Sequence, residues 1–198
     1  MHDSRHRLVA LAIALLLLVS PLYPASVAEF NLAQLTDHAQ RVFRGKVVDV
    51  VAGSVEAGGG RIPTLTYKFH VEQAFKGEFR TVKGIAFAEI RMVGKTKTVT
   101  RGKVRSVSPF ELPALTTGQS YLLFATAPSG VGLSTTVGLG QGRFEIRGAG
   151  EKETAVNERG NRMLFSGMST APLRATAREG PLPYSELAAQ IQSLVAGR

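Results

Sequence analysis

The stretch Leu65-Thr66-Tyr67-Lys68-Phe69-His70-Val71-Glu72 decides the fold class, because apolar and polar side chains alternate along it without interruption. Successive side chains of a β-strand point to opposite faces of a sheet, so this period of two predicts a strand with one buried face and one solvated face. Phe75-Lys76-Gly77 follows it as a turn signal. The pattern indicates a half-buried strand of an antiparallel sheet.

Apolar segments on both sides of this strand indicate further strands. The run Tyr121-Leu122-Leu123-Phe124 follows the turn residues Gly118-Gln119-Ser120, and its continuous apolarity predicts a central strand that is buried on both faces. The other predicted strands are residues 42–51 with a bulge or bend at Gly45, residues 81–90, residues 143–147, and a hairpin that pairs 154–156 with 163–165. We expect a loop at 53–62 and a long exposed hairpin or flap at 91–108.

A short amphipathic helix is expected at each end of this set of strands. Residues 31–40 carry apolar side chains at helical spacing, with Asn31 available as a cap. Ser185 is the expected cap of a second helix whose apolar stripe contains Leu187, Ile191, Leu194 and Val195. No long helical crossover separates the strands, so the sequence predicts a mainly β protein, an antiparallel OB-like barrel with a short N-terminal helix and a C-terminal helix.

The first 28 residues have the pattern of a secretory signal peptide. Arg5 and Arg7 precede an apolar run from Leu8 to Val19, and small residues occupy positions 26–28. The run is shorter than the roughly 20 residues of a membrane-spanning helix, and this pattern favours cleavage before Glu29. We therefore expect an exported protein, periplasmic or extracellular, with no membrane span after the signal is removed.

The composition restricts the chemistry of the exported chain. The formal net charge is +9, and removal of Arg5, Arg7 and Asp3 with the signal lowers it to +8, so the surface favours anionic partners. The chain has no cysteine, which excludes disulfides, thiolate catalysis and cysteine-bound metal. The mature length of about 170 residues suits one domain that is held together by packing.

Several of these segments together resemble a known group of proteins. The succession of a helix, Arg44-Gly45-Lys46-Val47, Tyr67-Lys68-Phe69-His70-Val71 and Gly118-Gln119-Ser120-Tyr121-Leu122-Leu123-Phe124 resembles uncharacterised exported bacterial proteins with a netrin-like or metalloproteinase-inhibitor-like barrel of the OB type. The resemblance covers roughly residues 31–147 and implies the fold. In the animal inhibitors with this barrel an N-terminal cysteine chelates the target's metal; this chain has no cysteine, so no site residue is carried over.

The strongest surface signal is a basic segment, our candidate anion-binding site. No acidic residue lies between Glu89 and Glu111, and the basic residues in this interval are Arg91, Lys95, Lys97, Arg101, Lys103 and Arg105. In an extended chain they share one face, which would bind an anionic polymer with strong salt dependence. The alternative is a solvated edge whose cations prevent strand aggregation. The segment has no aromatic residue on which bases could stack, which argues against nucleic acid.

The sequence offers little material for catalysis. His70 and Glu72 share a strand face and could supply two metal ligands for a hydrolase, but no third ligand is identifiable, and a solvated polar face is the alternative. His38 beside Asp37 is interpreted as a surface pair. No nucleophile elbow is present, and the glycines at 138–142 precede a strand rather than a helix, which favours a hairpin over a phosphate site. We expect no enzyme activity, no metal and no cofactor.

These observations predict three segments of the chain and leave three functional hypotheses. We expect a signal peptide at 1–28, an OB-like barrel at 29–165, and a linker with the C-terminal helix at 166–198. The first hypothesis is a non-catalytic binding module, a protein-interaction or inhibitor-like partner of another exported protein. The alternative is attachment to an anionic envelope polymer through the basic segment at 91–105. A metal-dependent hydrolase built on His70 and Glu72 is the least favoured hypothesis.

Overall fold

The computed structural model describes residues 28–99, 103–107, 114–168 and 179–197. The predicted signal peptide therefore lies outside the described residues, except for Ala28. The described elements in chain order are α2 (Leu32–His38), β1 (Arg41–Ala57), β2 (Gly60–Lys76), β3 (Arg80–Val82), β4 (Ile85–Val93), β5 (Lys95–Val99), β6 (Lys103–Val107), β7 (Ser120–Ala125), the 3-10 turn η1 (Leu139–Gly142), β8 (Arg143–Arg147), the 3-10 turn η2 (Gly150–Lys152), β9 (Thr154–Asn157), β10 (Leu182–Pro183) and α4 (Tyr184–Ala196).

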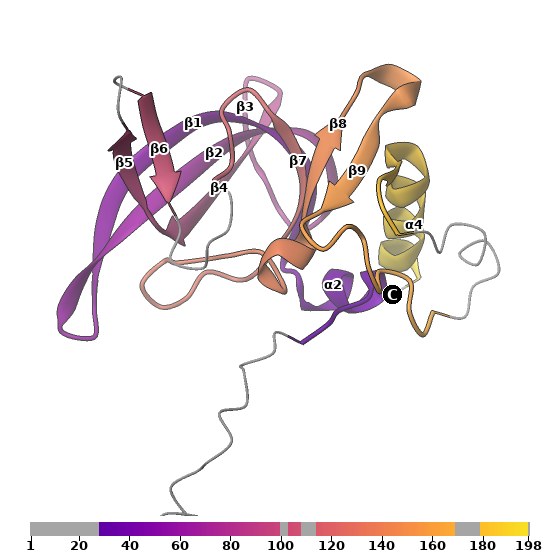
Figure 1. The fold of residues 1–198 in the computed structure, drawn as a ribbon, viewed down its shortest axis with the longest axis horizontal. Helices are drawn as coiled ribbons and strands as arrows, with labels where there is room; N and C mark the ends of the chain where they lie inside the picture. Colours follow the sequence, from indigo (N-terminus) through magenta and orange to yellow (C-terminus); the bar gives the residue numbers. More distant parts are fainter. Residues whose placement is uncertain (1–27, 100–102, 108–113, 169–178, 198) are drawn as a thin grey trace, which may run out of the picture.

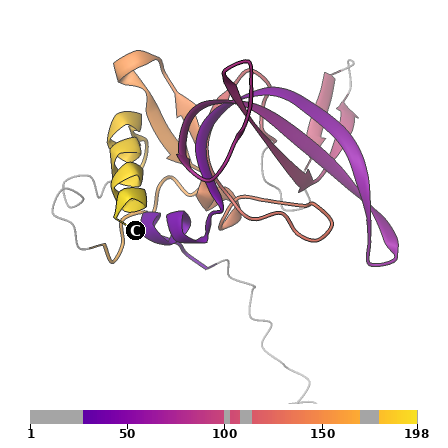
Figure 2. The ribbon, with the colours of Figure 1, turned by 180° about the vertical axis from the view of Figure 1, so that it is seen from behind.

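One antiparallel sheet of eight strands, in the order β10-β9-β8-β7-β1-β2-β4-β3, forms the body of the protein, and β5 and β6 form a separate two-stranded hairpin. The predicted mainly β, antiparallel fold with a helix near each end is confirmed. The sheet is strongly curved, with α2 and α4 packed beside each other at its β8–β9 end (Figures 1 and 2). Its outer strands β3 and β10 do not pair with each other, so the barrel-like curl is not closed by hydrogen bonds among the described strands.

The long hairpin of β1 and β2 contains the alternating stretch that decides the fold. The predicted bulge at Gly45 is confirmed by a register shift between Arg44 and Gly45. The predicted loop at 53–62 is wrong, because both strands continue through it and turn at Gly58-Gly59, which have φ values of 62° and 75°. Two successive residues with positive φ are typical of the tight turn that matches strand twist, so these glycines end the hairpin rather than loosen it.

The prediction of a single strand at 81–90 is also wrong. The chain turns at Lys83-Gly84, where both residues have positive φ, and this turn separates β3 from β4. β4 then extends to Val93, beyond the predicted end at Ile90. After Gly94 the expected hairpin of the 91–108 region is confirmed as β5 and β6.

Two apolar cores lie on the two faces of the sheet, and β7 contributes to both. Leu122 and Phe124 pack with α2 and α4, whereas Tyr121 and Leu123 face the interior of the curl beside Phe43 and residues of β2 and β4. The prediction that this central strand is buried on both faces is confirmed.

The helices are positioned by local hydrogen bonds and by the first of these cores. Asn31 caps α2 as predicted, because its side chain accepts from the Gln34 N–H while the Gln34 side chain accepts from the Asn31 N–H. α4 begins one residue before the predicted cap Ser185, so Ser185 lies inside the helix. Leu187 and Ile191 of α4 are buried in the first core, which places the C-terminal helix on the sheet.

The predicted hairpin between 154–156 and 163–165 is wrong. Residues 163–165 form turns, and β9 pairs instead with β10, with Leu182 opposite Ala155. The reason lies in two buried side chains, since Asn157 accepts from the N–H groups of Arg159 and Asn161, and Asn161 accepts from the Asn157 N–H. These bonds fold the chain into a compact turn and leave the edge of β9 open for β10.

Candidate functional site

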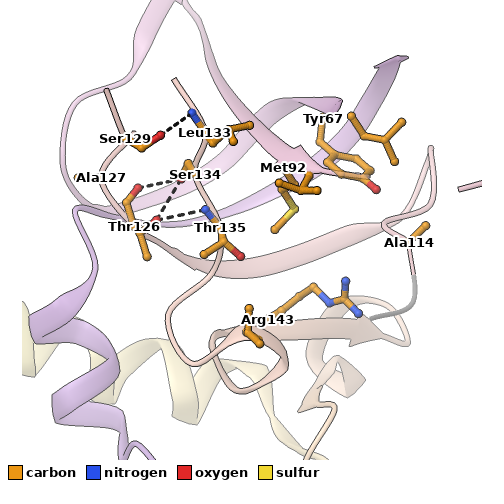
Figure 3. A pocket seen from close by; sticks show the side chains of 13 residues that line it. Tyr67, Met92, Ala114, Thr126, Ala127, Ser129, Leu133, Ser134, Thr135 and Arg143 are labelled. Atoms are coloured by element: carbon orange, nitrogen blue, oxygen red, sulfur yellow. Dashed lines mark hydrogen bonds between the residues drawn. The ribbon is translucent and has the colours of Figure 1, made fainter. Parts of the chain in front are cut away.

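An apolar cavity of about 450 Å³ opens inside the curl of the sheet (Figure 3). Leu65 and Tyr67 of β2 and Met92 of β4 form one wall, and Leu133 lies on the connection after β7 that forms the opposite wall. These positions follow from the strand period, since the apolar members of the alternating stretch all face the inside of the curl. Cavities that hold ligand groups are commonly roughly 300–1,000 Å³ and mostly apolar, so this one has a suitable size and character.

The wall formed by the connection after β7 is held in place by its own hydroxyl groups. The Ser134 hydroxyl donates to the Thr126 carbonyl over 2.9 Å, and the Thr126 hydroxyl accepts from the Thr135 N–H over 3.1 Å. A backbone bond of 2.8 Å from the Ser134 N–H to the Arg91 carbonyl ties the connection to β4. The cavity wall is therefore attached to the sheet at both of its sides, although sequence inspection indicated nothing more than a glycine-rich connection.

Arg143 brings a buried cation to the lining of this cavity (Figure 3). Its side chain is 8% exposed and forms an ion pair with Glu158. Burial lowers the pKa of Arg143, and the nearby Tyr67, Tyr121 and Glu145 oppose that effect. β8 begins where η1 packs against the sheet, so the neighbouring residues Arg143 and Phe144 are both buried.

The structure divides the predicted basic segment between two elements. Arg91 lies on β4, where its side chain donates to the Thr66 hydroxyl over 3.4 Å. On the separate hairpin, Lys97 of β5 pairs with Arg105 of β6, Lys95 pairs with Val107, and Lys103 pairs with Val99. The shared basic face of these residues stays a prediction. Arg101 lies outside the described residues.

His70 and Glu72, the two ligands of the hypothetical metal site, each contact other side chains. His70 stacks against Phe87 with ring centroids 5.9 Å apart, whereas Glu72 accepts from Arg44 and from the Ser120 hydroxyl. Within the described part of the chain there is no group of three or more histidine or acidic side chains that could bind a metal ion. His38 of α2 packs edge-on against Phe30.

Glu72 belongs to a polar cluster, the Arg44 network, which sequence reasoning did not find. The Arg44 guanidinium donates to Glu72 over 2.6 Å and to both carboxylate oxygens of Glu153 over 2.6 and 2.8 Å, and it lies 4.6 Å from the ring centre of Tyr184. The bond from Arg44 lowers the pKa of Glu153, and burial raises the pKa of Tyr184 to about 12. The network joins β1, β2 and the residue just before β9 to the start of α4, so its contacts are structural.

Comparison with known protein families finds no family model that matches the chain, and comparison with curated proteins finds no match. None of the helices among the described residues combines the length and hydropathy needed to cross a membrane.

Proposed function

We propose that this protein is an exported, non-catalytic binding module, and that its partner, another exported protein, inserts an apolar side chain into the cavity. The single observation that carries this proposal is the cavity itself, whose apolar lining comes from two strands and from a connection fixed by hydrogen bonds. A preformed apolar cavity binds with little loss of conformational freedom, which favours recognition of a compact apolar group.

The cavity can be tested with a defined small probe, N-acetyl-phenylalaninamide, followed by NMR titration. We expect shifts of the amide resonances of Leu65, Tyr67 and Leu133. The variant Ala127→Phe places a ring in the cavity lining and should weaken binding of the probe at least tenfold. Val131→Phe is the matched control, because Val131 is exposed on the same connection and does not line the cavity. Equal binding by the two variants would contradict the proposal.

The β5–β6 hairpin supports a second candidate function, attachment to an anionic envelope polymer. Its support is the register that pairs Lys97 with Arg105 and the absence of acidic residues between Glu89 and Glu111 in the sequence. Concentrated positive charge attracts polyanions by releasing their counterions, and this attraction weakens as salt rises.

Retention on dextran sulfate beads at low salt tests this candidate. Replacing Lys95, Lys97, Arg101 and Lys103 with Gln should abolish retention. The matched control replaces Arg80, Lys83, Lys152 and Arg159 with Gln, which removes the same charge from exposed positions elsewhere. If both variants lose retention equally, net charge rather than the hairpin is responsible, and the candidate is wrong.

A further inference from the structure

The outer part of β1 has a sheet neighbour on one side only. β7 pairs with β1 along Arg41–Lys46, and just beyond it the Val47 N–H donates to the Gln119 carbonyl while the Val47 carbonyl accepts from the Gly118 N–H. From Asp49 to Ala57 the described strands supply a partner on the β2 side and none on the other. This stretch projects from the body of the molecule as part of the long β1–β2 hairpin (Figures 1 and 2).

The register shows which backbone groups lie along this open edge. Ala57 and Gly60 flank the two-residue turn, so Ala57 bonds to β2 and every second residue before it does the same. The intervening residues direct their N–H and C=O groups outward, and they are Val50, Ala52, Ser54 and Glu56. Pro63, the residue opposite Ser54, gives independent support for this alternation of bonded and outward residues. It has no N–H to donate to β1, and its carbonyl accepts from the Gly94 N–H on the β4 side.

The ends of the main sheet are protected against further pairing, whereas this edge is not. β3 has three residues and is followed by Lys83, and β10 has two residues, one of which is Pro183. Short strands, lysines and prolines are the usual means of blocking a sheet edge. The segment Val50-Val51-Ala52-Gly53-Ser54-Val55 has no charge and no proline. An uncharged edge of this length, in a sheet whose two end strands are protected, points to a surface used for pairing.

We infer that the open edge of β1 binds an extended segment of a partner polypeptide, which adds to the sheet as a further strand. Backbone hydrogen bonds would supply affinity, and alternate side chains of the added strand would supply specificity. Those on the inner face would lie beside Val50 and Ala52, whose cross-strand neighbours Tyr67 and Leu65 line the cavity. The inference thus deepens the proposed protein-binding function and rests on it.

The charge of the chain favours an acidic segment of another protein over a second copy as the occupant. With a formal net charge of +9, two copies repel each other, whereas a net-acidic segment is attracted. The charged residues at the two ends of the open edge are already neutralised, since Asp49 pairs with Lys68 and Glu56 pairs with Arg61. The edge therefore presents mainly backbone groups.

Amide hydrogen exchange with a synthetic peptide tests the inference. The probe is acetyl-EVTVTVE-amide, an alternating peptide with acidic ends, and the control peptide has proline at the central valine. Binding should slow exchange at least tenfold at the outward amides of Val50, Ala52, Ser54 and Glu56. The inward amides of Val51, Gly53 and Val55 should be slow before the peptide is added. No change at the outward amides at millimolar peptide would overturn the inference.

Two variants at one position separate edge pairing from loss of folding. Ser54→Pro removes an outward N–H without removing a bond to β2, and should weaken peptide binding at least tenfold; Ser54→Ala keeps that N–H and should bind like the wild type. Dimers of the free protein that form through this edge, in sedimentation velocity, would also overturn the inference. Binding of N-acetyl-phenylalaninamide in the cavity without protection along β1 would contradict the edge inference while leaving the cavity proposal intact.

Discussion

Replacing Arg44 with Ala should destabilise the protein by about 3 kcal/mol. The guanidinium makes three hydrogen bonds to ionised Glu72 and Glu153, all between 2.6 and 2.8 Å, and its side chain is 18% exposed. Breaking a buried ion pair commonly costs about 3–5 kcal/mol because a charge is left without compensation. The side chains of this network are 18–28% exposed, so the ion pairs should contribute about 2–2.5 kcal/mol, below the range for buried pairs. Loss of the contact with Tyr184 adds about 0.5–1 kcal/mol.

Urea unfolding followed by circular dichroism measures this loss. With a slope of about 2 kcal/mol/M, the midpoint should fall by about 1.5 M. The control is Arg61→Ala, which removes an ion pair to Glu56 whose side chains are 75% and 73% exposed, and should change stability by less than about 0.5 kcal/mol. A loss below about 1 kcal/mol for Arg44→Ala would refute the reasoning, because it would show that the network behaves as a surface pair.

The Arg44 network should also make the stability of the protein depend on pH, and the direction of this dependence can be predicted. Arg44 holds the pKa of Glu153 below its ordinary value of 4.5. A carboxyl group with a lowered folded-state pKa stabilises the protein above its unfolded pKa, and this contribution is lost as the pH falls through the folded pKa. The difference in unfolding free energy between the wild type and Arg44→Ala should therefore be constant near neutral pH and shrink below about pH 4.5. A difference that grows on acidification would contradict this assignment.

Two further substitutions test the packing of the sheet. Phe124→Ala should cost about 3–5 kcal/mol in urea unfolding, because Phe124 is fully buried beside Phe144, whereas Val131→Ala at an exposed position should cost less than about 0.5 kcal/mol. Gly77→Ala should cost at least 2 kcal/mol, since a Cβ there would lie 2.7 Å from the Gln40 carbonyl oxygen at a φ of +89°; that figure combines about 1 kcal/mol of backbone strain with the clash. Gly58→Ala has positive φ but open space around it, so equal losses at the two glycines would show that the close approach is unimportant.

Neither the cavity nor the open edge of β1 could be predicted from the sequence, and the reasons differ. The connection at 126–135 reads as a loop, and its bond from Ser134 to Arg91 joins residues that are far apart in the chain. The edge of β1 was not predicted because the glycines at 53 and 58–60 indicate a loop. In the structure, both strands continue through this region because the turn between them matches the twist of the strands. The basic hairpin, in contrast, was predictable, because its charge pattern is local.

Local sequence by itself determined whether most elements are helices or strands. The evidence was a side-chain period or a local hydrogen bond: the alternation at 65–72, the apolar run at 121–124, the cap at Asn31 and the apolar stripe of α4. The tertiary structure alone decided which strands are neighbours, as with β9, which pairs with β10 rather than with 163–165. It also decided which polar side chains leave the solvent, as with the buried Arg143 and the half-buried Arg44. The physical reason is that side-chain periodicity depends on near neighbours along the chain. Pairing and burial depend on contacts between distant segments, whose free energy is fixed only when the whole sheet has formed.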